Sequence, residues 1–501
     1  MLSVLIWTPI IGAAIIGFWP GGAAQASRIR LVSLTLSGLV LLWNLFILLK
    51  FDPSNPGMQF REYLPWNETL GLSYQLGVDG LSILMLVLNS LLTWVAIYSS
   101  SQQTQRPRLF YSLILLVSGG VAGAFLAENL LLFFLFYELE LIPFYLLISI
   151  WGGEKRAYAG IKFLIYTAVS GALILATFLG MVWLTGASSF AFDAVSTQTL
   201  SAGMQIILLA GIIVGFGIKI PLVPFHTWLP DAYVEASAPI AILLGGVLAK
   251  LGTYGLLRFG LGMFPEAWST LAPTLAIWGA ISAIYGALVA IAQTDIKRMV
   301  AYSSIGHMGY ILVAGAASTP LALVGAVAQM FSHGIILAVL FLLVGIVEVK
   351  VGTRELDQLN GLMSPIRGLP LISALLVLSG MASAGIPGLT GFVAEFLVFQ
   401  GSFANFPIPT LLCVLSSALT AVYFVILLNR TCFGKLDNNK AYYARVMWSE
   451  KTPALVLTAL IIFLGVQPTW LVRWSEPTTT AMVAAIPMLE KVVPSEVALK
   501  P

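Results

Sequence analysis

Six ionisable side chains stand inside long apolar stretches of this sequence, far from any polar segment that would keep them in water. They are Glu138, Lys219, Lys250, His307, His333 and Glu395. A charge near the centre of a bilayer costs at least about 2.5–3.5 kcal/mol, so each of these groups needs a partner or a use. Any one of them could be half of a buried structural ion pair. Six of them in order along the chain favour a transport pathway instead.

The first pair in this series predicts a proton gate. Burial disfavours the charged form of a lysine, whereas a carboxylate close by favours it. Lys219 would therefore hold its proton while paired with Glu138 and release it when the pair opens. Glu140 follows two residues later, about 200° further round a helix, so it cannot share the face of Glu138. We expect Glu140 to face a neighbouring subunit.

The remaining groups predict a lateral relay. Lys250, His333 and Glu395 would pass the proton sideways towards an exit near Glu395, and His307 is a further candidate. Histidine suits the middle of such a series because it can both accept and donate a proton near neutral pH. Moving one charge across the membrane costs about 2.3 kcal/mol per 100 mV, so the work must come from outside this chain.

The elements that would position these groups are membrane-spanning helices. Of the 501 residues, 59% are hydrophobic and only 9% are charged, and apolar runs recur from end to end. This composition predicts an all-α polytopic membrane protein with about fourteen spans. We place the spans at about 2–19, 31–49, 78–98, 109–127, 130–150, 160–184, 204–229, 239–260, 271–291, 299–316, 320–347, 370–400, 409–429 and 453–472.

The basic residues test this layout. Of the 25 Lys and Arg, 17 fall in loops on one side, six on the other, and two are the lysines inside the spans. Loops that stay in the cytoplasm collect Lys and Arg, so the bias predicts both termini on the opposite, periplasmic or lumenal side.

Two spans carry residues that interrupt a helix. The seventh contains Pro221 and Pro224 just after Lys219, and the twelfth contains Ala384–Gly388 with Pro387. Proline removes a backbone donor and clashes with the preceding turn, so each span should divide into two half-helices.

These two spans lie five helices apart, which predicts two inverted repeats, one of helices 4–8 and one of helices 9–13. The implied units are an N-terminal part at 1–108, a first repeat at 109–260, a second repeat at 271–429 and a C-terminal part at 430–501.

Several chemistries find no support in the sequence. It contains no phosphate-binding GxxxxGK[ST], no HExxH zinc motif and no GxGxxG between a strand and a helix. The two cysteines and three histidines are too scattered to suggest a haem or an iron–sulfur cluster. We expect no cofactor in this chain.

Five stretches resemble the antiporter-like subunits of complex I and the related multisubunit Na⁺/H⁺ antiporters. They are VDGLS around Asp79, FYELELIPFYLL around Glu138, GIKIPLVPFHTWLPDAYVEASAPIAILLGGVLAKLGTYGLLRF around Lys219 and Lys250, QTDIKRMVAYSSIGHMGY around His307, and GIPGLTGFVAEF around Glu395. The likeness covers nearly the whole chain. It implies a fourteen-helix fold and roles in proton translocation for Glu138, Lys219, Lys250, His333 and Glu395.

Within the family, Glu395 stands where other subunit types carry Lys, which favours the chain 4 type (D subunit), as found in cyanobacterial and plastid NAD(P)H-quinone oxidoreductases. One departure is that Glu395 does not hold the same position relative to its break as Lys219 does. The resemblance implies a proton-translocating subunit of an oxidoreductase complex in the thylakoid membrane, beside other antiporter-like chains and lipids. NAD(P)H or ferredoxin, iron–sulfur clusters and plastoquinone would then belong to other subunits.

Two alternatives remain. One is a subunit of a multisubunit Na⁺/H⁺ antiporter, and sodium-dependent proton flux without quinone reduction would identify it. The other is a structural membrane subunit with a vestigial channel.

Overall fold

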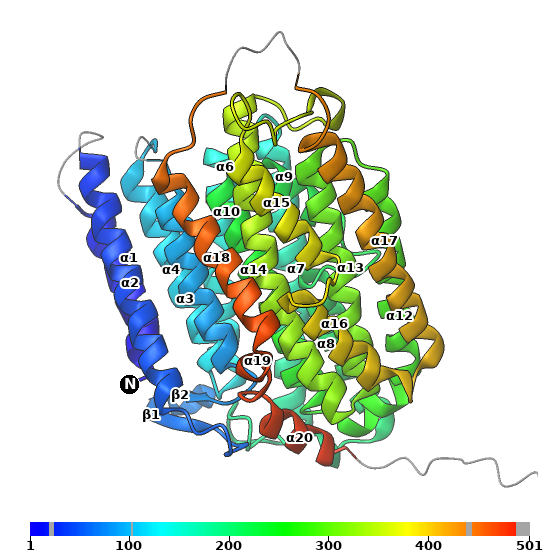
Figure 1. The fold of residues 1–501 in the computed structure, drawn as a ribbon. Helices are drawn as coiled ribbons and strands as arrows, with labels where there is room; N and C mark the ends of the chain where they lie inside the picture. Colours follow the sequence, from blue (N-terminus) through cyan, green and yellow to red (C-terminus); the bar gives the residue numbers. More distant parts are fainter. Residues whose placement is uncertain (20–24, 102–103, 437–442, 487–501) are drawn as a thin grey trace, which may run out of the picture.

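The computed structural model describes residues 1–19, 25–101, 104–436 and 443–486. Its helices run side by side between two ends of one bundle (Figure 1). One end carries a two-stranded hairpin, and we call it the hairpin end. The opposite end carries the starts of α2, α4 and α18, and we call it the basic end because Arg28, Arg106 and Lys451 lie there.

The first half of the chain supplies α1 to α11 and the hairpin. The bounds are α1 Ser3–Gly17, α2 Ala26–Lys50, β1 Gln59–Asn67, β2 Leu72–Val78, α3 Ile83–Ser99, α4 Pro107–Leu126, α5 Leu130–Leu139, α6 Leu141–Trp151, α7 Arg156–Thr185, α8 Ala202–Lys219, α9 Trp228–Glu235, α10 Ala238–Leu243 and α11 Ala249–Gly255. Two π-helical segments, Leu244–Leu248 and Leu256–Leu261, flank α11.

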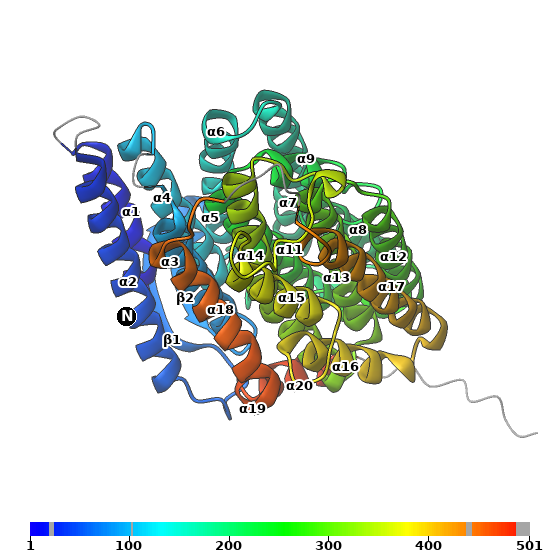
Figure 2. The same cartoon turned by 45° about the horizontal axis from the view of Figure 1, so that its top comes forward.

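The second half is helical throughout its described elements. The bounds are α12 Pro265–Ile291, α13 Ile296–Ala317, α14 Pro320–Val351, α15 Pro370–Ser383, α16 Thr390–Phe403, α17 Pro407–Thr431, α18 Trp448–Val466, α19 Thr469–Val472 and α20 Glu476–Ala484. Figure 2 shows α13 and α14 in the middle of the bundle, with α1 and α2 at one edge and α12 and α17 at the other.

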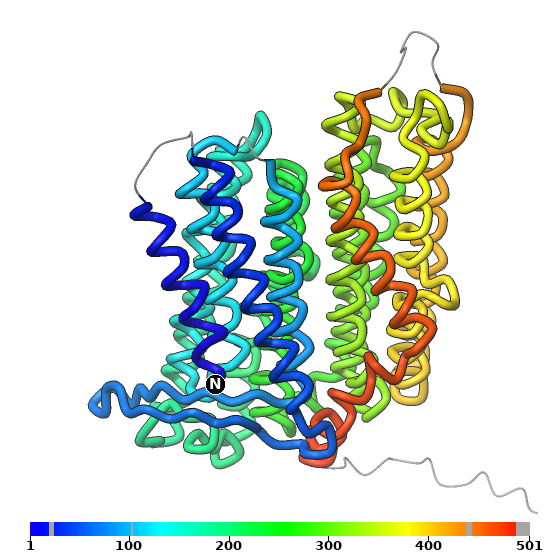
Figure 3. The backbone as a smooth tube through the Cα atoms, turned by 60° about the vertical axis from the view of Figure 1, so that its left-hand side comes forward, coloured from blue at the N-terminus to red at the C-terminus, as the bar shows by residue number. Residues whose placement is uncertain are grey.

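Eleven helices of the described chain are long and apolar enough to cross a membrane. Three shorter apolar helices, Ser3–Gly17, Ile83–Ser99 and Pro370–Ser383, lie within other predicted spans. The polytopic helical fold is therefore confirmed, while the count of fourteen crossings and the inverted repeats stay predictions. The N-terminus and α20 both lie at the hairpin end (Figures 1 and 3), as an even number of crossings requires.

The hairpin departs from the all-α prediction. β1 and β2 pair antiparallel, and the turn between them closes at Gly71 with φ of 62°, a conformation that glycine adopts without steric cost. The third span was predicted to begin at residue 78, but Val78 belongs to β2. Helix α3 starts only at Ile83, after the Asp79 carboxylate has accepted hydrogen bonds from the backbone N–H groups of Leu81 and Ser82.

Both predicted interruptions are present. Helix α8 ends at Lys219, and the chain passes Pro221 and Pro224 before α9 begins. Helices α15 and α16 are separated by a segment in which Gly385 and Gly388 have φ of 69° and 89°. A third interruption was not predicted: α5 and α6 meet at Glu140, because Pro143 has no N–H to donate to the preceding turn.

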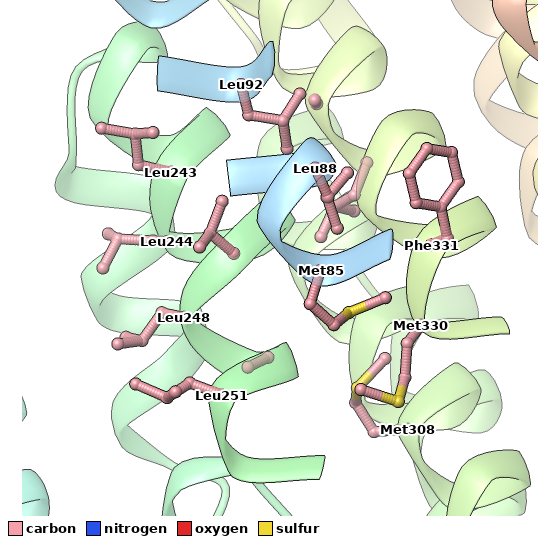
Figure 4. Packing of buried hydrophobic residues seen from close by; sticks show 14 of the residues in the cluster. Met85, Leu88, Leu92, Leu243, Leu244, Leu248, Leu251, Met308, Met330 and Phe331 are labelled. Atoms are coloured by element: carbon pink, nitrogen blue, oxygen red, sulfur yellow. The ribbon is translucent and has the colours of Figure 1, made fainter. Parts of the chain in front are cut away.

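Part of the buried core is packed around α3. Leu88 and Leu92 of α3 lie between the helical segment at 243–251 and helix α14 (Figure 4). There the backbones of Gly246 and Gly334 approach closely, since a Cβ on Gly334 would lie 3.0 Å from the Gly246 carbonyl oxygen. This contact brings the turn before Lys250 against the turn that carries His333.

Candidate functional site

A buried ion pair stands at the interruption between α8 and α9. The Lys219 ammonium bonds the Glu140 carboxylate, and the two side chains are 1% and 0% exposed. The ammonium also lies 4.3 Å from the centre of the Tyr137 ring. Tyr137 and Glu140 are three residues apart and so share one face of their helix. The interruption places the lysine at the end of a helix, where a charged side chain meets two partners at once.

This geometry corrects the predicted pairing of Lys219 with Glu138 and the predicted outward direction of Glu140. Glu138 and Glu140 do occupy different faces of the helix, as predicted. However, Glu140 and not Glu138 lies on the face that meets Lys219. Glu138 lies in a partly exposed row with Leu135 and Ile142, which are 43% and 53% exposed. Its carboxylate rests against Gly171 of α7. Glu138 thus points towards α7, and Glu140 points into the bundle core towards Lys219.

Aromatic rings fill the space between the ion pair and the hairpin end. Phe133 lies 4.6 Å from Phe259 between ring centres, Phe216 lies 6.0 Å from Phe259, and Tyr137 lies 5.8 Å from Phe216. All four rings are fully buried. Because Phe133 and Phe216 stand closer to the hairpin end than Glu140 and Lys219 do on the same helices, this cluster separates the ion pair from that end.

Lys250 lies one helix further into the core. Its ammonium donates to the Gly245 carbonyl oxygen at 2.5 Å, within a π-helical turn, and lies 2.7 Å from His333 Nδ1. Both side chains are almost completely buried. π-helical turns are rare and occur often at functional sites. The sequence predicted a regular helix here, but it did place Lys250 next to His333 in the series.

His307 and Glu395 continue from His333. The two histidine rings are 5.3 Å apart between centres, and His307 Nε2 lies 3.4 Å from Glu395 Oε1. His307 Nδ1 donates to the Ser303 carbonyl at 2.8 Å. The other Glu395 oxygen accepts a hydrogen bond of 2.6 Å from Ser417 of α17. The structure therefore brings His307 directly between His333 and Glu395.

A small cavity separates His333 from Glu395. Its volume is about 10 Å³, and its lining includes both of these residues, His307 and Gln329. The buried atoms His333 Nε2 and Gln329 Oε1 have no hydrogen-bond partner among the described residues. A cavity of about this size holds one water molecule. One water placed here could accept from His333 and donate to Gln329 or Glu395.

The ion pair and the relay are neighbours. A Cβ on Gly252, two residues after Lys250, would lie 3.3 Å from Lys219 Cβ and 3.1 Å from the Ile220 nitrogen. The backbones that carry the two lysines are therefore in contact. All six predicted residues belong to this connected region, with Glu138 at its outer edge and Glu140 added to it.

Sequence reasoning missed a second buried charge cluster, near the hairpin. Arg258 Nη2 lies 2.7 Å from both carboxylate oxygens of Asp79, and Arg258 also bonds the Tyr254 hydroxyl at 3.2 Å. Asp79 had been noted only within the VDGLS stretch. Its position directly after a strand, next to the N-terminus of an apolar helix, was a signal for a capping carboxylate.

Among the residues that the structure describes, no group of three or more His, Cys, Asp or Glu side chains is arranged to hold a metal ion. The chemistry available to the assembled groups is proton transfer between lysine, imidazole and carboxylate.

Known proteins place this arrangement in a family. The family described as "NADH:quinone oxidoreductase/Mrp antiporter, TM" matches residues 127–420. The chain belongs to this family. The match includes all six predicted site residues and Glu140, and it confirms the resemblance drawn from the sequence motifs.

Two cyanobacterial relatives are named as chain 4 of an NAD(P)H-quinone oxidoreductase. NAD(P)H-quinone oxidoreductase chain 4 1 from a Synechococcus strain is 38% identical over 100% of this chain and 95% of its own length. NAD(P)H-quinone oxidoreductase chain 4 of Prochlorococcus marinus is 38% identical over 93% of this chain and 88% of its own. These names agree with the chain 4 type that Glu395 indicated.

Solved structures agree with the fold. A chain of respiratory complex I from Thermus thermophilus aligns with a TM-score of 0.87 and 28% identity, covering 97% of this chain and 99% of that one. A chain of the Mrp complex from a Dietzia species aligns with a TM-score of 0.86 and 22% identity over 96% and 97% of the two chains, which shows a shared fold.

Proposed function

We propose that this chain is a proton-translocating membrane-arm subunit of an NAD(P)H-quinone oxidoreductase complex, in which other antiporter-like subunits are its neighbours. One observation carries the proposal: Lys250, His333, His307 and Glu395, from four different helices, form one buried series of proton-transfer groups. Intramembrane ionisable groups mark ion pathways and proton relays. The family membership and the name of the relatives supply the complex.

The relay follows from the ring nitrogens of His333. A proton given by the Lys250 ammonium to Nδ1 can be matched by loss of the proton on Nε2, because an imidazole carries protons on opposite sides of the ring. His333 Nε2 faces the one-water cavity. From there the proton would reach His307 or Glu395. The imidazole would then return to its first form by reorienting.

The gate lies at Lys219. Glu140 holds the ammonium in the core, and Glu138 offers a second carboxylate on the outer face of the same helical stretch. We propose that the ammonium leaves Glu140 during the cycle and that its proton passes towards Lys250. The aromatic cluster of Phe133, Phe216 and Phe259 supports a lateral route, since it blocks water from the hairpin end.

The proposal extends to the surroundings of the chain. The cyanobacterial relatives support a thylakoid or plasma membrane, and the basic residues support lumenal or periplasmic termini. The electron donor, the iron–sulfur clusters and plastoquinone would belong to other subunits, and the redox reaction there would supply the work.

The decisive experiment measures protons moved per electron in proteoliposomes that contain the whole complex. His333→Gln should lower this ratio while quinone reduction with an uncoupler present continues, because the substitution removes a group that can both accept and release a proton. His226→Gln is the matched control. His226 is also buried, but its ring packs 4.8 Å from Tyr285, outside the relay. A full ratio in an assembled His333→Gln complex would refute the relay.

The same assay distinguishes this function from that of a Na⁺/H⁺ antiporter subunit. Proton movement that requires Na⁺ and continues without quinone reduction would assign the chain to a multisubunit Na⁺/H⁺ antiporter. A complex that needs Lys219 and Lys250 only for assembly would indicate the structural role.

A further inference from the structure

A large cavity opens at the basic end, well apart from the proton-transfer groups. Its volume is about 700 Å³, within the range of pockets that hold small organic ligands. The ends of seven helices line it, α2, α3, α4, α6, α10, α14 and α18, and the residues include Arg30, Tyr98, Trp151, Ser237, Val349 and Met447. Because α2, α3, α6, α14 and α18 all begin or end here, the cavity lies where a bundle of spanning helices meets the membrane surface.

Two polar atoms in the lining lack partners. Arg30 Nε and Ser237 Oγ are buried, yet neither has a hydrogen-bond partner in the part of the chain that the structure describes. One Arg30 terminal nitrogen donates to the Tyr98 carbonyl oxygen, which holds the guanidinium in place, and its other nitrogens make no hydrogen bond within the described residues. Buried polar groups without partners are uncommon, and each one calls for a ligand or a water. Both atoms belong to residues that line the same cavity.

Arg30 supplies a positive charge at the cavity that no carboxylate of the described chain neutralises. Arg30 forms no ion pair with any carboxylate in the described part of the chain. Glu450 is the one acidic residue among the described lining residues, and Lys350 pairs with it at 2.8 Å. An arginine with free donors is well suited to a phosphate or sulfonate, whose oxygens accept several N–H groups at once.

The walls and the rim are apolar. Leu342, Ile346 and Phe110 contribute to the walls, whereas Val349 and Met447 at the rim are 78% and 60% exposed. Such exposed apolar side chains next to Tyr98 and Trp151 are typical of the level where lipid headgroups meet acyl chains. A small inorganic anion would contact Arg30 but would leave the apolar rim uncovered. A lipid would cover both, with its headgroup at Arg30 and its acyl chains on the rim.

We propose that this cavity binds the anionic headgroup of a membrane lipid, with Arg30 and Ser237 as its donors and the acyl chains lying over Val349 and Met447. Basic pockets between spanning helices are known to bind acidic lipid headgroups. The site does not depend on the proposed proton relay. It would tie α2 of the N-terminal helices to α14 and α18 of the second half, which Figure 3 shows on opposite sides of the bundle.

The test uses the whole complex in proteoliposomes with a phosphatidylglycerol that carries a photoreactive diazirine on an acyl chain. Labelled peptides are identified by mass spectrometry. We expect labelling at 345–351 and 447–450, reduced about tenfold by Arg30→Gln, since the substitution removes a charged hydrogen-bond donor. Arg28→Gln is the matched control. It removes the same charge two residues earlier on α2, from an exposed side chain outside the lining.

A second variant tests the site in case Arg30→Gln fails to fold. Val349→Trp places a large ring at the exposed rim and should lower labelling while Arg30 is intact. Phosphatidylcholine with the same diazirine should label these segments far less than phosphatidylglycerol. Inorganic phosphate in the buffer should not displace the label. The proposal is overturned if Arg30→Gln labels normally, if both lipids label equally, if phosphate alone displaces the label, or if a neighbouring subunit fills the cavity in the assembled complex.

Discussion

Replacing Glu140 by glutamine tests the ion pair at the centre of the proposed gate. The substitution keeps the shape of the side chain and removes its charge. Lys219 would remain buried, with the Tyr137 ring 4.3 Å from its ammonium as its nearest favourable contact. Removing one partner of a buried ion pair costs about 3–5 kcal/mol, because the other charge is left buried and unpaired. We expect Glu140→Gln to lower the free energy of unfolding by about this amount.

Glu138→Gln is the matched comparison. The Glu138 side chain is partly exposed, and no hydrogen bond joins it to Lys219 in the structure. Glu138 has no ion pair among the described residues, so its replacement leaves no buried charge unpaired, and the expected loss is much smaller than for Glu140→Gln. Proton translocation should fall in both variants, because both carboxylates belong to the proposed gate. The free energy of unfolding therefore distinguishes the two residues, whereas proton translocation does not.

The assay is unfolding of the purified chain by sodium dodecyl sulfate in mixed micelles, followed for the four proteins of a double-mutant cycle. Combining Glu140→Gln with Lys219→Met should recover much of the loss, since neutral replacement of both partners of a buried pair is often tolerated. The assignment is wrong if Glu138→Gln destabilises the chain as much as Glu140→Gln does. It is equally wrong if the second substitution recovers nothing.

Two further substitutions test the positioning of the relay. Gly334→Ala would place a Cβ 3.0 Å from the Gly246 carbonyl oxygen. Overpacking of this kind costs about 1–3 kcal/mol, so the midpoint of unfolding should fall. The control is Gly203→Ala, whose Cβ meets open space and should leave the midpoint unchanged. Ser417→Ala removes the 2.6 Å hydrogen bond to Glu395 and should slow proton translocation in proteoliposomes without slowing quinone reduction, whereas Ser417→Thr should restore it. An unchanged midpoint in the first case, or equal rates for the two Ser417 variants, would contradict these expectations.

The interruptions of α8–α9 and α15–α16 could be predicted because their cause is local. Pro221 and Pro224 lack the donor that a helix needs, and Gly385 and Gly388 adopt positive φ values that other residues avoid. The interruption at Glu140 has the same cause, Pro143, but one proline alone is a weak signal in a membrane helix.

Contacts between distant segments were beyond reach of the sequence. His307 lies in α13 and Glu395 in α16, and their 3.4 Å contact depends on where α16 begins after its interruption. The hairpin was missed for a related reason. β2, with the sequence LSYQLGV, alternates apolar and polar residues over a short stretch. A hydropathy window that detects spans covers about 19 residues and averages such alternation away.

The reversal of Glu138 and Glu140 has a physical origin that applies to any membrane helix. In water, the buried face of a helix is apolar and the exposed face is polar, so the pattern of residues identifies the inner side. In lipid both faces are apolar, because acyl chains and protein cores favour the same side chains. Leu135 and Ile142 on the outer face are therefore no different in kind from Phe133 on the inner face. The sequence required the two carboxylates to point apart, and only the packing of α5 against α8 determines which one meets Lys219.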